Sequence, residues 1–193
     1  MNSHNKNTPF SRKVWLLAFA VVLGTVLKAE AVTSQDIEIH VSINATKSLS
    51  AGATDYNYGA LGVNVSSVSS NIVITNDATG IQETFTLLAG NAISDAAGTD
   101  WTLAASTSTD QYKLGAQFSS AQPANNDGAW DATDYMTAGA QACTSTRFGN
   151  GVLGQAGASV APSATRNLWF RLHTPDSVSD VGPHTATVTL AVQ

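Results

Sequence analysis

The sequence predicts an all-β protein, a single antiparallel β-sandwich with one long irregular insertion. Apolar and polar residues alternate with a period of two over several short segments, clusters of turn-forming residues separate those segments, and no convincing helical stretch occurs beyond the N-terminal region. Only 12% of the 193 residues are charged, whereas about a quarter is usual in globular proteins. This low fraction argues against a helical bundle with charged outer faces.

The N-terminal region has the layout of a secretory signal peptide. Basic residues precede an apolar run at positions 14–27, and the Ala-Glu-Ala sequence at 29–31 supplies a cleavage site between small residues. The run is shorter than the about 20 residues that a membrane-spanning helix needs. We therefore expect a signal-peptide helix within residues 1–31 and a mature domain, residues 32–193, that is secreted, periplasmic or at the cell surface. An uncleaved membrane anchor is the alternative.

Removal of residues 1–31 makes the expected product more acidic. The whole chain has a formal net charge of −5, with nine basic and fourteen acidic residues. The removed segment holds four of the basic residues and one acidic residue, which leaves five against thirteen, a net charge of −8. Because such a surface repels phosphate backbones and anionic headgroups, we expect no nucleic-acid partner and no membrane contact after cleavage.

Seven segments have the alternation of β-strands. The clearest covers residues 36–45, where four β-branched residues fall on one face and polar residues on the other. The turn cluster at 77–80 predicts a hairpin between the second and third segments, and a loop with Pro and Gly joins the last two. The other six predicted strands are 70–76, 82–88, 101–105, 112–118, 167–172 and 184–192.

The alternation fades in residues 119–165, where Gly, Ala, Asn, Asp, Ser and Thr dominate. An irregular segment of this length is unusual inside a compact domain, so we expect it to contain a short helical turn near residues 131–136 and a small β excursion. Binding residues concentrate on loops that a rigid scaffold holds. This insertion is therefore the most suitable place for a binding site.

Residues 56–87 contain three local elements in a fixed order. These are an aromatic-Gly-x-hydrophobic-Gly element at 58–62, a Ser-rich stretch at 66–70, and a hydrophobic strand at 72–76 that ends in Thr-Asn. Together with the C-terminal strand pair at 167–192, they resemble bacterial immunoglobulin-like domains of exported or cell-surface proteins. The resemblance implies an immunoglobulin-like sandwich with a structural or adhesive role.

The insertion also carries the candidate ligand-binding residues. Asp127, Asp131 and Asp134 belong to the densest acidic cluster, and Ca²⁺ takes carboxylate and carbonyl oxygens, which gives a calcium hypothesis although the spacing is not that of an EF-hand. Equally, Asp suits turns and helix caps without a metal. Trp130 and Tyr135 are candidates for stacking on a sugar ring, or for core packing.

No catalytic motif stands out, and the lone Cys143 has no histidine near it in sequence, so we expect an incidental, at least partly buried thiol. The leading hypothesis is a non-enzymatic structural or cell-surface protein without a cofactor, a fibre or surface-layer subunit. Its expected partners are further copies of itself or other surface proteins, joined by strand addition through residues 36–45. Pairing of this strand within its own sandwich is the alternative. A second hypothesis is a secreted carbohydrate- or calcium-binding module that uses the 119–165 insertion.

Overall fold

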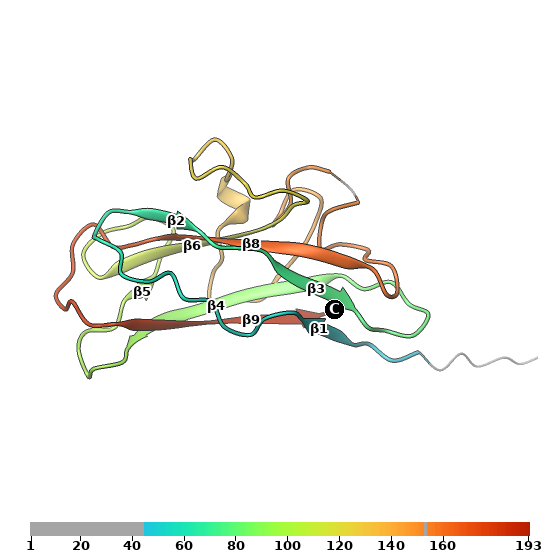
Figure 1. Cartoon of the computed structure of the whole chain (residues 1–193), viewed down its shortest axis with the longest axis horizontal. Coiled ribbons are helices and arrows are strands. Elements are labelled where there is room, and N and C mark those ends of the chain that lie inside the picture. Colours follow the sequence, from blue (N-terminus) through green and yellow to red (C-terminus); the bar gives the residue numbers. More distant parts are fainter. Residues whose placement is uncertain (1–44, 153) are drawn as a thin grey trace, which may run out of the picture. The chain divides into compact units, whose positions relative to one another are not determined.

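The computed structural model describes residues 45–152 and 154–193, which fold as two packed β-sheets (Figure 1). The predicted signal peptide and all but the last residue of the predicted strand 36–45 lie outside these residues. Within the described part, no helix has the length and apolar character needed to cross a membrane.

The larger sheet has the order β1-β3-β8-β6-β5, with β2 also paired to β8, and the smaller sheet has the order β7-β4-β9. All strand pairs are antiparallel except β5 with β6. The prediction of an all-β sandwich is confirmed, with this one parallel exception to the antiparallel pattern. The strands are β1 (Leu49–Ala51), β2 (Ser66–Val68), β3 (Ile72–Asn76), β4 (Phe85–Ser94), β5 (Thr102–Leu103), β6 (Gln111–Phe118), β7 (Gln141–Ala142), β8 (Thr165–His173) and β9 (His184–Val192).

Alternate residues of the strands form the core between the two sheets. On β6 the even-numbered residues face inward, and on β4 the odd-numbered residues from Phe85 to Ala89 do so. This is the period-two burial that the sequence predicts. The buried core residues that these strands and β3 contribute are Ile72, Ile74, Phe85, Leu87, Ala89, Ala92, Tyr112, Leu114, Ala116 and Phe118.

The predicted hairpin between residues 70–76 and 82–88 is wrong. These residues contribute to β3 and β4, which belong to different sheets. The buried Asn76 side chain directs the crossing, because its Nδ2 donates to the carbonyl oxygens of Ile81 and Val160 at 3.1 and 2.8 Å. The turn residues therefore form an arch across the sandwich. The last two strands, β8 and β9, are likewise joined by an arch between the sheets.

The 119–165 insertion closes one long side of the sandwich. It contains a 3₁₀ turn, η1 (Ala132–Asp134), and the short strand β7, as its composition predicts. Just after η1, the backbone N–H of Met136 donates to the Leu114 carbonyl on β6 at 2.9 Å. Further on, β7 pairs with β4 of the smaller sheet. The insertion thus connects the edges of both sheets (Figure 1).

The opposite long side is formed by the edge strands β1 and β9. Over its nine residues, β9 has β4 as its one ladder partner within the described part of the chain. Its inward-facing apolar residues pack against the core but are only partly buried. These residues are Ala186, Val188, Leu190 and Val192.

Candidate functional site

A hollow of about 290 Å³ lies between the insertion and the larger sheet. It contains Asp127, Trp130 and Tyr135 among its lining residues, three of the five site residues that the sequence predicts. Asp131 and Asp134 do not line it. The full lining is Ala105, Lys113, Asp127, Trp130, Ala132 and Tyr135.

Strands β6 and β8 position the cationic groups of this region. Lys113 and Gly115 on β6 stand opposite His173 and Arg171 on β8, so all four share one face of the sheet. Glycine is required at 115 for packing, because a Cβ atom there would lie 3.0 Å from Trp130 Cε3 and 3.3 Å from Tyr135 Cε1. The bare backbone therefore lets the two aromatic side chains rest on the sheet.

The two aromatic residues differ in what they offer a ligand. Trp130 is 2% exposed, and its Nε1 donates to the Ala124 carbonyl at 2.9 Å, so it mainly packs the insertion against the sheet. Tyr135 is partly exposed, and the Lys113 ammonium lies 3.9 Å from its ring centroid. This distance is typical of a cation–π contact, which fixes the lysine over the ring.

A buried arginine lies directly beneath the hollow. The Arg171 side chain is 3% exposed, and its Nη1 donates to Asp127 Oδ1 at 2.8 Å and to the Tyr135 hydroxyl at 3.1 Å. Its Nε donates to Asn125 Oδ1 at 3.1 Å, and Nη2 lies 3.5 Å from Ser66 Oγ. The Arg171 contact is the main reason that the pKa of Asp127 lies below its ordinary value.

His173 lies beside this ion pair. Its Nε2 is 3.8 Å from Asp127 Oδ1, and Ser66 Oγ is 2.9 Å from its Nδ1. Burial, with the charges of Arg171 and Lys113, lowers the pKa of His173 to about 4. The imidazole is therefore neutral at pH 7. Two cations then face one carboxylate around the hollow, a local positive charge in a chain whose net charge is −5.

The other two aspartates have local structural roles. Asp131 caps η1, with Oδ1 accepting from the Thr133 N–H at 2.7 Å. Asp134 is 1% exposed, and its Oδ2 accepts from the Asp131 N–H at 3.0 Å and from Gln117 Nε2 at 3.1 Å. Burial raises the pKa of Asp134 to about 6. These contacts match the capping alternative in the sequence analysis.

The three predicted aspartates are not arranged as a calcium site. Among residues 45–152 and 154–193, no group of three or more His, Cys, Asp or Glu side chains is arranged to hold a metal ion. Asp127 binds Arg171, Asp131 caps a turn, and Asp134 is buried.

Cys143 lies in the core that the insertion covers. It is 2% exposed and unpaired as a thiol, which confirms the expected buried cysteine. Burial raises its pKa to about 12. A thiol in this environment is held in its protonated, weakly nucleophilic form.

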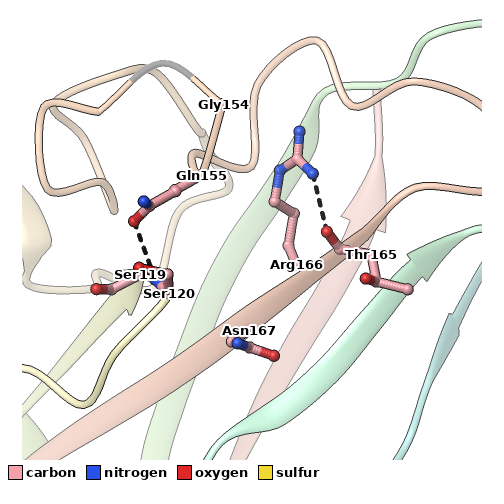
Figure 2. Close-up of a pocket in the computed structure, with 7 residues that line it drawn as sticks. All are labelled: Ser119, Ser120, Gly154, Gln155, Thr165, Arg166 and Asn167. Atoms are coloured by element: carbon pink, nitrogen blue, oxygen red, sulfur yellow. Dashed lines mark hydrogen bonds between the residues drawn. The ribbon is translucent and has the colours of Figure 1, made fainter.

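A second hollow of about 210 Å³ is lined by polar residues and one glycine (Figure 2). The Arg166 guanidinium donates to the carbonyls of Thr165 and Ala156 at 2.8 and 3.0 Å, and Gln155 Oε1 accepts from the Ser120 N–H at 3.0 Å. It contains no aromatic residue and none of the predicted site residues, so it is the weaker candidate. Its lining consists of Ser119, Ser120, Gly154, Gln155, Thr165, Arg166 and Asn167.

Sequence reasoning missed the two cations of the first hollow. Lys113 and Arg171 lie within predicted strands, and nothing in their local sequence relates them to the insertion. The one available signal is a charged residue within the otherwise apolar segment around Arg171, since a charge in a buried strand needs a partner.

Known proteins give no family for the chain. No protein-family model matches it, and no curated protein has significant sequence similarity to it.

Proposed function

We propose that the chain is a non-enzymatic structural protein, exported and then assembled into a fibre or surface layer by strand addition. The observation that carries this proposal is the outer edge of β9, beside which residues 45–152 and 154–193 place no further strand. Unpaired edges are normally short, charged or covered. In contrast, β9 is nine residues long and has no charged side chain among its residues apart from the titratable His184.

The core residues beneath this edge support the same reading. Leu87 on β4 and Leu190 on β9 are direct partners in the smaller sheet. Leu87 is fully buried, whereas Leu190 is only partly buried. Partly exposed apolar residues along a free edge suit the addition of one more strand.

Residues 36–45 have the sequence that such a strand needs. Four apolar residues alternate there over a length that matches β9. An added strand gains main-chain hydrogen bonds along the edge, and its alternate side chains cover the apolar row. We propose that this segment pairs with β9 of a neighbouring copy, which would link copies into a chain.

The first test compares two double variants of the mature chain, residues 32–193. Ile39→Asn with Val41→Asn removes apolar side chains from the proposed inward face, and His40→Asn with Ser42→Asn changes the other face as the matched control. Light scattering after size exclusion and negative-stain microscopy should find assemblies for the wild type and the control only. A wild type that stays monomeric at all concentrations contradicts assembly.

A second test separates pairing between copies from pairing within one copy. Cysteines replace Ser42 in the proposed donor strand and the exposed Thr187 of β9, and a short bismaleimide links them while the buried Cys143 stays unreactive. A ladder of multimers on a denaturing gel supports the proposal. An internally linked monomer, with no ladder, overturns it.

Export has its own test. N-terminal sequencing of the protein recovered from the extracellular, periplasmic and surface fractions should begin near Val32. Recovery of the uncleaved chain from the membrane fraction would favour the anchor instead.

The hollow beneath the insertion favours a second candidate function, a secreted saccharide-binding module. One cavity of about 290 Å³ is lined by Asp127, Trp130 and Tyr135, which belong to no recognised sequence motif. Its volume is near the lower end for small-molecule sites. A glycan array with the mature chain tests this candidate, and Tyr135→Ala should abolish any signal.

A further inference from the structure

We propose that the hollow beneath the insertion binds a carboxylated saccharide, and that Asp127 occupies the place of the ligand carboxylate on Arg171. This inference rests on the second candidate function, saccharide binding, and adds the chemical class of the ligand. Its structural basis is the unequal burial of the two partners in one ion pair.

The Arg171 side chain is buried among protein groups, whereas its ion-pair partner, Asp127, is exposed to solvent. Its guanidinium is 3% exposed, with Asn125, Tyr135 and Ser66 around it, whereas the Asp127 side chain is 80% exposed. A buried cation needs a charged or strongly polar partner. Here the partner is an exposed carboxylate on a loop, which a ligand carboxylate of the same chemistry is able to replace.

The guanidinium also has capacity for a second contact. Asp127 Oδ1 meets Nη1 at 2.8 Å, while the one hydrogen bond of Nη2 to a described residue is the 3.5 Å contact with Ser66 Oγ. Arginine prefers carboxylates that engage two of its N–H groups at once. A ligand carboxylate that meets both nitrogens would therefore make better use of Arg171 than Asp127 does.

Lys113 adds a second cation on the same wall. Its ammonium lies over the Tyr135 ring, and it forms no ion pair with any residue that the structure describes. With His173 neutral, a ligand carboxylate that replaces Asp127 would lie near both Lys113 and Arg171. The charge of the hollow thus selects an anionic ligand, although the net charge of the chain is negative.

The aromatic wall indicates a saccharide rather than a bare anion. The Tyr135 hydroxyl accepts a hydrogen bond from Arg171 Nη1, and the partly exposed Tyr135 ring borders the cavity. An aromatic ring beside polar groups is the usual surface for the apolar face of a sugar ring. A uronic acid combines that ring with one carboxylate.

The test is calorimetry on the mature chain at low salt, with glucuronate, glucose and acetate as probes. We expect glucuronate to bind at least about tenfold more tightly than either glucose or acetate. Asp127→Asn removes the internal competitor and should tighten glucuronate binding by about threefold to fivefold, the size expected for an exposed ion pair. Asp55→Asn, at another exposed aspartate, controls for the change in net charge.

Lys113→Gln provides a second variant that leaves Arg171 intact. We expect it to weaken glucuronate binding by at least about threefold, with thermal unfolding used to verify that the variant is folded. The inference is overturned if Asp127→Asn weakens glucuronate binding or if Lys113→Gln has no effect.

The three probes separate the two levels of the proposal. Equal binding of glucose and glucuronate overturns the carboxylate inference and leaves saccharide binding in place. Equal binding of acetate and glucuronate overturns the claim that the hollow recognises a saccharide. If no probe binds, both the inference and the second candidate function fail for monosaccharide ligands of this class.

Discussion

The two long sides of the sandwich are finished in different ways. On one side the insertion runs from β6 to β7 and joins the edges of both sheets. On the other side, within the part of the chain that the structure describes, the sheets end at β1 and β9. The closed side is built from the least regular part of the sequence, and the open side includes one of its cleanest alternating strands. Strand character alone therefore does not determine whether an edge is covered.

Scattered apolar residues in the insertion explain the closed side. Met136, Cys143, Phe148 and Val160 all join the main core and are at most 3% exposed. These residues have no regular spacing in the sequence, because an irregular backbone brings each of them to the core. In contrast, β9 supplies a regular row that has the core on only one side and no further strand beside it in the described residues.

The largest expected difference between the sides concerns two leucines that face each other. Leu87→Ala should lower the free energy of unfolding by about 3 to 4 kcal/mol, because the side chain is fully buried. Leu190→Ala should cost about 1 to 1.5 kcal/mol, since that site is only partly buried. Urea unfolding of residues 32–193 measures both.

Equal costs for the two leucines would break the comparison. They would mean that β9 is covered as well as β4, for example by residues 36–45 of the same chain. Under assembling conditions, a rise in the cost of Leu190→Ala alone would instead support covering by a neighbour.

The next effect concerns how stability depends on pH, because two groups on the closed side should change it in opposite directions. The pKa of Asp134 is raised to about 6, so the folded state binds more protons than the unfolded state between about pH 4 and 6. Stability from this group therefore falls as the pH rises through that window, by up to about 3 kcal/mol. The charge of Asp131 also raises the pKa of Asp134.

The pKa of His173 is lowered to about 4, with Arg171, Lys113 and Asp127 as its charged neighbours. The folded state thus binds fewer protons between about pH 4 and 6.5, and stability from His173 rises with pH there. In Asp134→Asn the free energy of unfolding should rise with pH, because the His173 contribution remains. In His173→Gln it should fall with pH, because the Asp134 contribution remains. Chemical denaturation from pH 4 to 7 measures both, and identical profiles would contradict these assignments.

A smaller effect concerns close packing within the insertion. A Cβ atom at Gly157 would lie 2.6 Å from Phe118 Cε2 and 2.9 Å from Cys143 Sγ. Gly157→Ala should therefore destabilise the protein by about 1 to 3 kcal/mol. Gly154→Ala is the matched control, because no atom lies within 4 Å of its added Cβ, and it should change stability by about 0.5 kcal/mol or less.

The smallest effect is on the accessibility of the closed side. Cys143 is buried with a raised pKa, so Ellman's reagent should label it slowly at pH 8 and only through local opening. Gly157→Ala should accelerate labelling more than Leu190→Ala does. Labelling that is faster in the Leu190 variant would mean that both sides open together.

The alternation of residues predicted the strands well but not their partners. Residues 184–192 were predicted with the bounds of β9, and 112–118 nearly with those of β6, because a half-buried strand has a strong period. The hairpin prediction was wrong because the same cluster of turn residues occurs whether the chain reverses within one sheet or crosses to the other. The crossing depends on the contact between Asn76 and Val160, which no local pattern contains.

The hollow was predicted in part for the same reason. Asp127, Trp130 and Tyr135 stood out in the insertion by composition. Arg171 was missed because its contact with Asp127 joins positions 44 residues apart, and only the register of β6 and β8 places Lys113 near them. The strands β1, β2 and β7 are two or three residues long, too short to show a period.

The arches that carry the chain between the sheets also determine the order of folding. Strand β4 lies between β3 and β6 in the sequence, yet its long partner is β9, and β3 and β6 are joined only through β8. Neither sheet is able to form its central pairs until residues 165–192 are available, and loop closure over such separations is slow. We therefore expect a newly made chain to stay unfolded until late in its synthesis, a state compatible with the export proposed above.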